Sequence, residues 1–492
     1  VFFAMSMKRW VLLFFVYVLQ WPLNAQVSHP PYRYVAPDSV ETFVSDRYKA
    51  HSFLRYLLMG KNYRNVWEQR VVLPVFRLSQ SGLKIEELGG GMQTKSLKLE
   101  DKNGQEWALR TLDKDVAGAL SGFLEGTIAE SVAQDQISAS MPYSSLIIGP
   151  LAKSAGVRAA SPTIYFVADD TAFGQYNSIF AGTICMLEAR NAGFEDTDNT
   201  EDMLRKVMAT NKYVVDQRSL LRARLLDMII ADWDRHFDNW RWGKHDSAGL
   251  RYYHAVPRDR DWAFYFSNGL VPKLARLIAL RFMINFSEKL DYIQSVNYKG
   301  RRLDEIFLHG LSAADWQEMI RQLQRDLDDN AIAQAVHQLP PSIYALIGDS
   351  FIKKIKGRRN DLEKQAMKYY RSLARTVQIE GSGDNEWFTL MPSTDGFRLQ
   401  IHQRLPNGEK GARLYDRTFV RAETYRVTLN GLGGDDRFTI DEDVRTAIRL
   451  QLNGGEGADT YELNGHVRAN VFDNAGQNSF PSNKSGSKIS FR

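Results

Sequence analysis

Residues 234–239 read Asp-Arg-His-Phe-Asp-Asn, and residues 259–264, twenty positions after the first stretch ends, read Asp-Arg-Asp-Trp-Ala-Phe. The first stretch follows residues 218–230, whose apolar side chains recur at helical spacing, with Asp216 as a candidate N-cap. Residues 250–256, between the two stretches, are rich in β-forming side chains. We therefore expect both acidic stretches to lie in loops of a helix-loop-strand arrangement.

The residue types in these two stretches suit phosphoryl transfer from a nucleotide. That chemistry needs a carboxylate to orient a hydroxyl group and hard oxygen ligands that hold Mg²⁺ against the phosphates. Asp234 is the candidate base, Asn239 supplies a neutral oxygen from the same loop, and Asp259 supplies a charged one. The spacing therefore predicts ATP with Mg²⁺ or Mn²⁺ as the cofactor, and Asn239 and Asp259 as the metal ligands.

Residues 234–240 resemble the catalytic loop of type II phosphatidylinositol 4-kinases. They are also similar to the corresponding loops of HipA-type kinases and of the atypical kinases of the secretory pathway. The metal-binding stretch of the lipid kinases, Asp-x-x-x-Ala-Phe, matches residues 259–264, and this alignment places the metal on Asp259 rather than Asp261. The resemblance implies an α+β fold with a two-lobed, kinase-like domain, in which a β-rich N-lobe precedes a helical C-lobe.

A glycine turn lies where such an N-lobe needs one. Residues 83–99 have the pattern strand, glycine turn, strand, and the turn contains Gly89, Gly90 and Gly91. Backbone without side chains can approach phosphates closely, although hairpins also use glycine for geometry alone.

The third strand of the N-lobe, residues 106–114, departs from the kinase pattern. Arg110 stands where a phosphate-pairing lysine is expected, and Lys114 is the alternative cation. Glu130 or Asp135, in a helix expected from about residue 124 onward, is the candidate partner acid. This departure indicates a degenerate enzyme. Residues 184–188 are interpreted as a plain core strand in preference to a hinge.

The N-terminal region predicts export. Residues 1–25 combine Lys8-Arg9 with an apolar run, which is typical of a signal peptide, with an uncleaved anchor as the alternative. Residues 26–80 are interpreted as an N-terminal helical extension. A single cysteine, Cys185, excludes an intramolecular disulfide. We expect a periplasmic or outer-membrane-associated protein.

The domain division follows the change in pattern along the chain. Residues 81–376 are assigned to the kinase-like domain, with helical patterning from 271 onward, and residues 377–492 to a β-rich repeat domain of stacked coils. The closing aromatic residues of three repeat copies lie at 438, 461 and 480.

The Gly-Asp turns of this repeat resemble the calcium-binding repeats of RTX proteins, which implies Ca²⁺ at Asp436 and Asp459. The repeat copies are far apart, and Gly and Asp are common turn formers, so purely structural turns are favoured.

The overall charge of +5 is too small to indicate a nucleic-acid partner. A basic run at residues 353–375 is either a solvated helix face or a surface for anionic lipid headgroups. Segments such as 89–97 and 429–438 resemble a middle region of large Bacteroidetes envelope proteins, which implies an outer-membrane or envelope partner.

Two classes of function follow. One is a kinase-like phosphotransferase acting on a protein, lipid or glycan acceptor, and the other is a catalytically inactive pseudokinase that serves as an interaction module. A third hypothesis, a metal-dependent hydrolase, would use the residues His236, Asp238, His254, Asp259 and Asp261.

Overall fold

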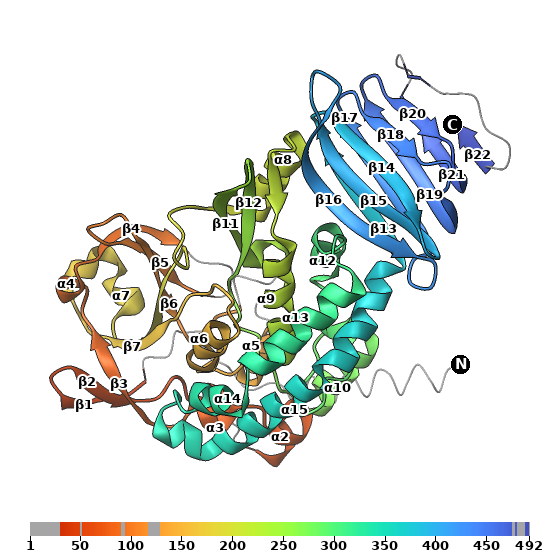
Figure 1. Cartoon of the computed structure of the whole chain (residues 1–492). Coiled ribbons are helices and arrows are strands. Elements are labelled where there is room, and N and C mark those ends of the chain that lie inside the picture. Colours follow the sequence, from red (N-terminus) through yellow and green to blue (C-terminus); the bar gives the residue numbers. More distant parts are fainter. Residues whose placement is uncertain are drawn as a thin grey trace, which may run out of the picture.

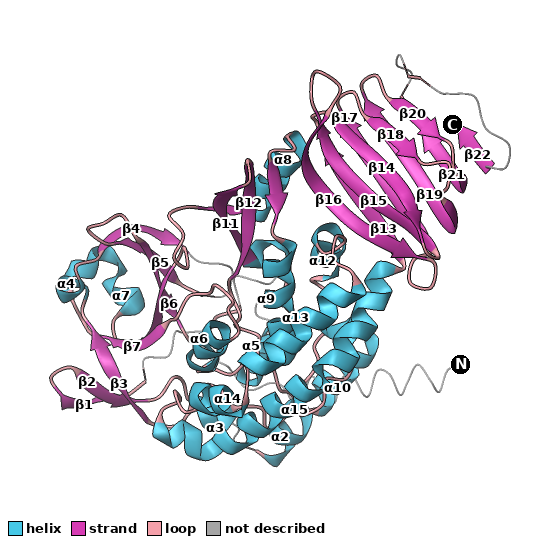
Figure 2. Ribbon diagram, in the orientation of Figure 1, coloured by secondary structure: helices cyan, strands magenta, loops and turns pink. Residues whose placement is uncertain are grey.

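The computed structural model describes residues 30–49, 52–89, 94–116, 128–474, 478–479 and 488–491. Three parts follow one another along the chain, as Figures 1 and 2 show: a β-rich lobe, a helical lobe and an all-β domain. A single 34-residue helix, α15 (Pro341–Ala374), leads from the helical lobe to the all-β domain. The signal peptide expected at residues 1–25 lies outside the described residues.

The β-rich lobe is built on one sheet with the strand order β1-β2-β3-β7-β8-β6-β5-β4. Pairing is antiparallel throughout, apart from β3 with β7. In β5, Leu97 and Leu99 are fully buried while the residues between them are not, which is the alternation of a half-buried strand. The strands are β1 (Arg33–Ala36), β2 (Ser39–Thr42), β3 (Val71–Phe76), β4 (Lys84–Gly89), β5 (Ser96–Glu100), β6 (Glu106–Thr111), β7 (Thr163–Val167) and β8 (Ile184–Ala189).

The described residues between 30 and 81 differ from the expected helical extension at residues 26–80. They contain three strands as well as three short helices, and β3 joins the main sheet of the lobe. Residues 184–188 form part of β8, a strand between β7 and β6, as the plain-strand interpretation predicted. The helices and 3-10 turns of this lobe are α2 (Phe53–Met59), α3 (Arg64–Trp67), α4 (Leu78–Ser81), α5 (Ile128–Gln136), η2 (Ile137–Ala139), α6 (Ser144–Ser154), η3 (Thr171–Tyr176) and α7 (Asn177–Phe180).

The helical lobe carries a small sheet with the order β10-β12-β11-β9. Helix α9 begins after Asp216, whose side chain accepts a hydrogen bond from the Ser219 N–H, as expected of an N-cap. The elements are β9 (Thr197–Asn199), α8 (Thr200–Ala209), β10 (Tyr213–Val215), α9 (Gln217–Ile229), η4 (Phe237–Asn239), β11 (Trp240–Ser247), β12 (Leu250–Pro257), α10 (Leu270–Ile278), α11 (Ile293–Val296), α12 (Arg301–Phe307), α13 (Ala313–Asp326) and α14 (Asp329–Val336).

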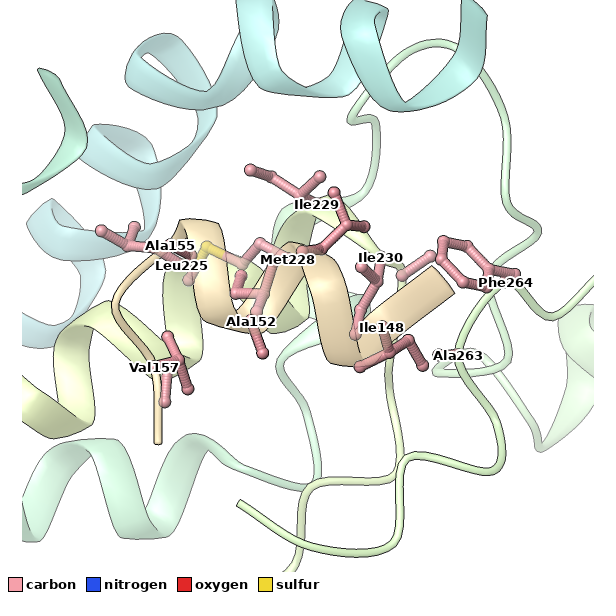
Figure 3. Packing of buried hydrophobic residues seen from close by; sticks show 14 of the residues in the cluster. Ile148, Ala152, Ala155, Val157, Leu225, Met228, Ile229, Ile230, Ala263 and Phe264 are labelled. Carbon is pink, nitrogen blue, oxygen red and sulfur yellow. The ribbon is translucent and has the colours of Figure 1, made fainter. Parts of the chain in front are cut away.

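The hydrophobic core of the helical lobe holds the end of α9 in place, and the loop at residues 232–239 follows that end. Figure 3 shows Ile148 and Ala152 of α6 packed among Met228 and Ile230 at the end of α9, with Phe264 beyond them. Ile230 and Phe264 are fully buried, and each such side chain contributes roughly 1.5–3 kcal/mol by leaving water. The packed end of α9 therefore gives the acidic loop a rigid base.

The C-terminal domain consists of two five-stranded sheets. One has the order β13-β17-β19-β21-β22 with parallel pairing, and the other has the order β16-β15-β14-β18-β20. It has its own hydrophobic core, separate from that of the lobes. The strands are β13 (Thr376–Ser382), β14 (Glu386–Ser393), β15 (Gly396–Arg404), β16 (Lys410–Val420), β17 (Arg426–Gly433), β18 (Arg437–Ile440), β19 (Arg445–Glu456), β20 (Thr460–Leu463), β21 (His466–Phe472) and β22 (Lys488–Phe491).

Each copy of the sequence repeat forms one coil of this domain, and successive coils stack on one another. Phe438 in β18 pairs with Tyr461 in β20, so one coil lies one 23-residue repeat above the next. The rings of Phe388, Phe438 and Tyr461 form a stack, with centroids 4.6 Å and 5.1 Å apart. The third aromatic residue of the pattern, Phe480, lies outside the described residues. The α+β fold class, with a β-rich lobe and a helical lobe followed by a small all-β coil domain, is confirmed.

The Gly-Asp turns are filled by a ladder of hydrogen bonds. The Asp436 carboxylate accepts from the Glu386 N–H at 2.7 Å, and the Asp459 carboxylate accepts from the Asp436 N–H at 2.7 Å. A Cβ atom at Gly431 would lie 2.0 Å from Asp436 Oδ2, and one at Gly454 would lie 2.1 Å from Asp459 Oδ2. The glycines thus make room for buried carboxyl groups. One oxygen of each carboxyl group accepts from a main-chain N–H, which is the structural-turn role that the sequence favoured, and no observation supports calcium at these turns.

Two structural features are absent from the described residues. No helix there combines the length and the apolar character that crossing a bilayer requires. No group of three or more His, Cys, Asp or Glu side chains in the same residues is arranged to hold a metal ion.

The stability of the C-terminal domain should fall as the pH rises, because of Asp436. Burial first, and then the charge of Glu386, raises the pKa of this carboxyl from 3.8 to about 10 in the folded state. A group whose folded pKa is raised contributes fully below about pH 4, and its contribution is lost progressively toward pH 10. Asp436→Asn, which keeps the acceptor oxygen, should remove most of this decline.

Hydrogen exchange of β17–β20 amides at a series of pH values measures the effect, after correction for the intrinsic exchange rate. Addition of a chelator should leave protection unchanged in both proteins. Equal pH dependence in the wild type and in Asp436→Asn would contradict the assignment.

Candidate functional site

A buried arginine joins the two acidic stretches. Arg235 Nη1 donates to the carbonyl oxygen of Arg258 at 2.6 Å and to that of Asp259 at 3.3 Å, while Nη2 donates to the Asn239 carbonyl at 3.0 Å. Its guanidinium carbon lies 4.6 Å from the ring centroid of Trp240. The Arg258 N–H also donates to the Asn239 carbonyl at 2.9 Å. Asn239 and Asp259 are therefore held side by side through their backbones.

The charge of Arg235 is balanced by Asp227 on α9. Arg235 Nε lies 3.2 Å from Asp227 Oδ2, and Arg260 Nε donates to Asp227 Oδ1 at 3.0 Å. Burial alone would raise the pKa of the Asp227 carboxyl, but the charges of Arg235, Arg260 and Arg224 hold it below its usual range. Arg224 is paired in turn with Asp304 of α12 at 2.9 Å. The loop thus rests on a buried ionic network that spans the helical lobe.

Two carboxyl groups, Asp259 and Asp261, face each other after β12. The negative charge of Asp261, followed by burial, raises the pKa of Asp259 to about 6. Burial would also raise the pKa of Asp261, but Lys114, at 2.8 Å, holds that carboxyl ionised. Asp259 has a φ of +52°, a left-handed conformation that costs energy for a residue with a side chain. Strain and like-charge proximity at one residue are typical of functional sites.

The expected cations reach the same place from the β-rich lobe. Arg110 of β6 lies 3.6 Å from Glu188 of β8, and Glu188 lies 3.5 Å from Arg258. A cleft of about 60 Å³ is lined by these side chains together with Asp259 and Asp261. Both Arg110 and Lys114 therefore face the acidic pair, as a nucleotide site between two lobes requires.

The glycine turn is partly described. Gly89 ends β4 and pairs with Ser96, which in turn pairs with Arg110. Gly89 therefore lies in register with Arg110, the candidate for binding phosphate, with β5 between them. Gly89 is not among the described residues that line the cleft. Gly90 and Gly91 lie outside the described residues.

Asp234 has a partner that the sequence did not reveal. Lys299, between α11 and α12, lies 2.5 Å from Asp234 Oδ1, and its ammonium group is 5.0 Å from the ring centroids of Trp233 and Phe282. Asn239 Nδ2 donates to the main-chain carbonyl of Asp234, so its amide oxygen is directed elsewhere. No motif connects Lys299 to the loop 65 residues before it, and only the fold brings them together.

Asp135 does not play the role suggested for it. Its carboxylate is buried and binds Arg64 and Arg55, at 2.5 Å and 2.7 Å, rather than Lys114. Glu130 lies in the first turn of α5. The acid that pairs with Lys114 is Asp261, because the chain after β12 turns back toward β6.

The residues of the hydrolase hypothesis are dispersed. His236 pairs with the exposed carboxylate of Asp238 at 3.5 Å, and His254 pairs with Asp216 at 3.3 Å. Neither histidine is among the described residues that line the cleft with Asp259. The structure therefore gives no support to a histidine-based metal centre.

Comparison with known proteins found similar solved structures, two of which are described here, but no sequence family. No family model matches the chain, and no curated protein matches it. A proinflammatory kinase from Helicobacter pylori, CtkA, matches with 10% identity over 60% of this chain and 99% of its own, with a TM-score of 0.33. The Rio2 kinase from Chaetomium thermophilum, in a complex with ADP/Mg²⁺ and phosphoaspartate, matches with 14% identity over 59% and 72%, with a TM-score of 0.25. Similarity at these TM-scores carries no functional argument.

Replacing Arg235 should destabilise the chain strongly. Arg235→Met leaves Asp227 with less compensation in a fully buried site and removes three main-chain hydrogen bonds, so the free energy of unfolding should fall by about 3–5 kcal/mol. Chemical denaturation measures this. Arg251→Met, which removes an exposed ion pair with Asp246, is the matched control and should leave the free energy of unfolding almost unchanged, because water and salt screen that pair. Similar losses in both variants would show that Arg235 is not an anchor.

Proposed function

We propose that this protein is a kinase-like phosphotransferase that uses ATP and a divalent metal ion. The observation that carries the proposal is the meeting of Arg110 and Lys114, from one lobe, with the carboxyl pair Asp259 and Asp261, from the other. A nucleoside triphosphate binds together with a metal ion of the opposite charge. Its site therefore needs cations that contact the phosphates and a carboxylate that binds the ion.

The carboxyl pair fits a divalent cation. Repulsion from Asp261 favours the protonated form of Asp259, and a bound cation would reverse that preference by favouring ionisation. Asn239, whose backbone is tied to that of Asp259 through Arg235, adds a neutral oxygen. Mg²⁺ and Mn²⁺ accept such oxygen ligands. Asn239 and Asp259 would hold the ion, which would neutralise phosphate charge.

Arg110 is chemically suited to the place of the phosphate-pairing lysine. A guanidinium group stays charged and can bind phosphate oxygens through two parallel hydrogen bonds. Glu188 holds Arg110 in the cleft, as the glutamate partner of a kinase lysine would. Lys114, paired with Asp261, is the second cation available to the phosphates.

Asp234 would act as the base. The acceptor hydroxyl oxygen would bond to the γ-phosphorus as the bond to the leaving ADP oxygen breaks, and Asp234 would receive the hydroxyl proton. Lys299, now paired with Asp234, would have to move toward the transferred phosphoryl group, where its charge would be useful. The acceptor class, whether protein, lipid or glycan, stays a prediction, as does export to the periplasm or outer membrane.

One observation favours the alternative, a pseudokinase that acts as an envelope interaction module. The cleft volume of about 60 Å³ is below the roughly 300–1,000 Å³ of typical ligand pockets, so the lobes must open before a nucleotide can enter. The two functions differ in ATP turnover. An enzyme loses turnover in Asp234→Asn but still binds nucleotide, whereas a pseudokinase shows no turnover in either protein.

Asp259 and Asp261 should respond differently to substitution. Asp259→Ala removes the metal ligand and should abolish the rise in melting temperature caused by ATP with Mn²⁺, because a ligand stabilises only the state that binds it. Asp261→Ala removes the repulsion that protonates Asp259 and frees Lys114, so the rise should be retained. A thermal-shift assay at pH 7, with ATP and chelator as the blank, measures both. Equal loss in the two variants would mean that the metal register is wrong.

A further inference from the structure

The exposed apolar side chains of this protein are concentrated on two short helices. Of the nineteen large apolar side chains exposed in the described part of the chain, nine belong to residues 53–57 and 270–280. Phe53 of α2 is 81% exposed, and Leu277 and Ile278 of α10 are 70% and 79% exposed. Soluble surfaces rarely gather apolar groups in this way unless they bind something.

The two helices meet where α2 ends and α10 begins. A Cβ atom at Gly269, the N-cap of α10, would lie 2.3 Å from the main-chain carbonyl carbon of Met59 in α2. The Lys61 N–H also donates to the Asn268 side chain at 2.9 Å. The exposed apolar residues of these two adjoining helices, with Leu280, are hereafter called the α2–α10 patch.

The chain segments that carry the α2–α10 patch contain basic residues but no acidic ones, and the acid that pairs with Arg55 of α2, Asp135, is buried. The sequence contains no Asp or Glu between Asp46 and Glu68, and none between Asp261 and Glu288. Lys61, Lys273 and Arg281 lie within these segments and are exposed, and none of the three side chains forms an ion pair with a described residue. Apolar side chains with basic groups and no acid between them are the composition of a segment that lies in a membrane interface.

We propose that the α2–α10 patch docks this protein onto an anionic lipid surface. The apolar side chains would enter the boundary between headgroups and acyl chains, and the lysine and arginine side chains would meet the phosphates. A second copy of the chain fits less well. In a twofold contact the patch would face itself and bring Lys273 and Arg281 of both copies together without a counter-charge. The inference concerns a surface outside the cleft and does not depend on phosphotransfer.

Vesicle flotation with the full chain tests the proposal. The wild type should float with phosphatidylcholine vesicles that contain about a third phosphatidylserine, and more weakly with phosphatidylcholine alone. The double variant Leu277→Asp and Ile278→Asp should bind the anionic vesicles at least about tenfold more weakly, since each charge must enter the interface. Lys273→Gln with Arg281→Gln should also weaken binding, by roughly fivefold per residue, and only to the anionic vesicles.

Leu405→Asp is the matched control, because Leu405 is an exposed leucine in the C-terminal domain, and it should bind like the wild type. Residues 10–19, the other apolar stretch in the sequence, are the same in every variant, so any contribution from them is constant. Unchanged binding in the double variant would overturn the proposal. So would a wild type that fails to bind anionic vesicles, or one that is dimeric and becomes monomeric in the double variant without vesicle binding.

A second readout locates the contact directly. Cys185 is the single cysteine and is fully buried, so Ile278→Cys supplies one accessible thiol for a polarity-sensitive dye. Its emission should shift to the blue when anionic vesicles are added, and that of labelled Leu405→Cys should not. Equal shifts at both positions, or none at residue 278, would contradict docking through the patch.

Discussion

The buried guanidinium group of Arg235 is the interaction on which the candidate site depends. It is fully excluded from solvent, and it binds the carbonyl oxygens of Arg258, Asp259 and Asn239 while facing the carboxylate of Asp227. This group is a side-chain anchor shared by the loop after α9 and the turn after β12, and it adds to the main-chain bond from the Arg258 N–H to the Asn239 carbonyl. An arginine suits the task because its planar, permanently charged fork can bind several acceptors at once.

The position of this anchor explains where the charges of the site lie. The turn after β12 places Asp259 and Asp261 together, which is unfavourable unless cations compensate, and the β-rich lobe supplies Lys114 and Arg110 for that purpose. Like charges placed together lower the stability of the fold, but they are already in position when a ligand binds. The α+β architecture therefore acts as a frame: the sheet carries the cations, and the helical lobe carries the acids.

Local patterns predicted much of this arrangement, and long-range contacts account for the rest. The loop at residues 234–239 and the turn at residues 259–264 could be found because their spacing is short and fixed by one hairpin. The coil repeat could be found because parallel stacking requires equivalent residues at equal register, as Phe388, Phe438 and Tyr461 show. Lys299 could not be predicted, since its contact with Asp234 arises only after α11 and α12 have packed.

The errors have the same physical origin. Residues 26–80 were expected to be helical, but β3 pairs with β2 on one side and with β7, some ninety residues later, on the other, and this pairing decided its conformation. Glu130 or Asp135 was the candidate acid to pair with the cation, but Asp135 is neutralised by Arg55 and Arg64, and Lys114 pairs with Asp261. The Gly-Asp turns left calcium open as the less favoured alternative, and the backbone ladder at Asp436 and Asp459 agrees with the favoured interpretation as structural turns.

The measurement that tests the central claim most directly is the position of Mn²⁺ in crystals grown with a non-hydrolysable ATP analogue. Anomalous scattering identifies the ion without assumptions about its ligands. The account predicts a peak about 2–2.5 Å from both Asn239 Oδ1 and an Asp259 carboxylate oxygen, with analogue phosphates beside Arg110 or Lys114. A peak at another site, or an empty cleft at saturating analogue and Mn²⁺, would contradict it.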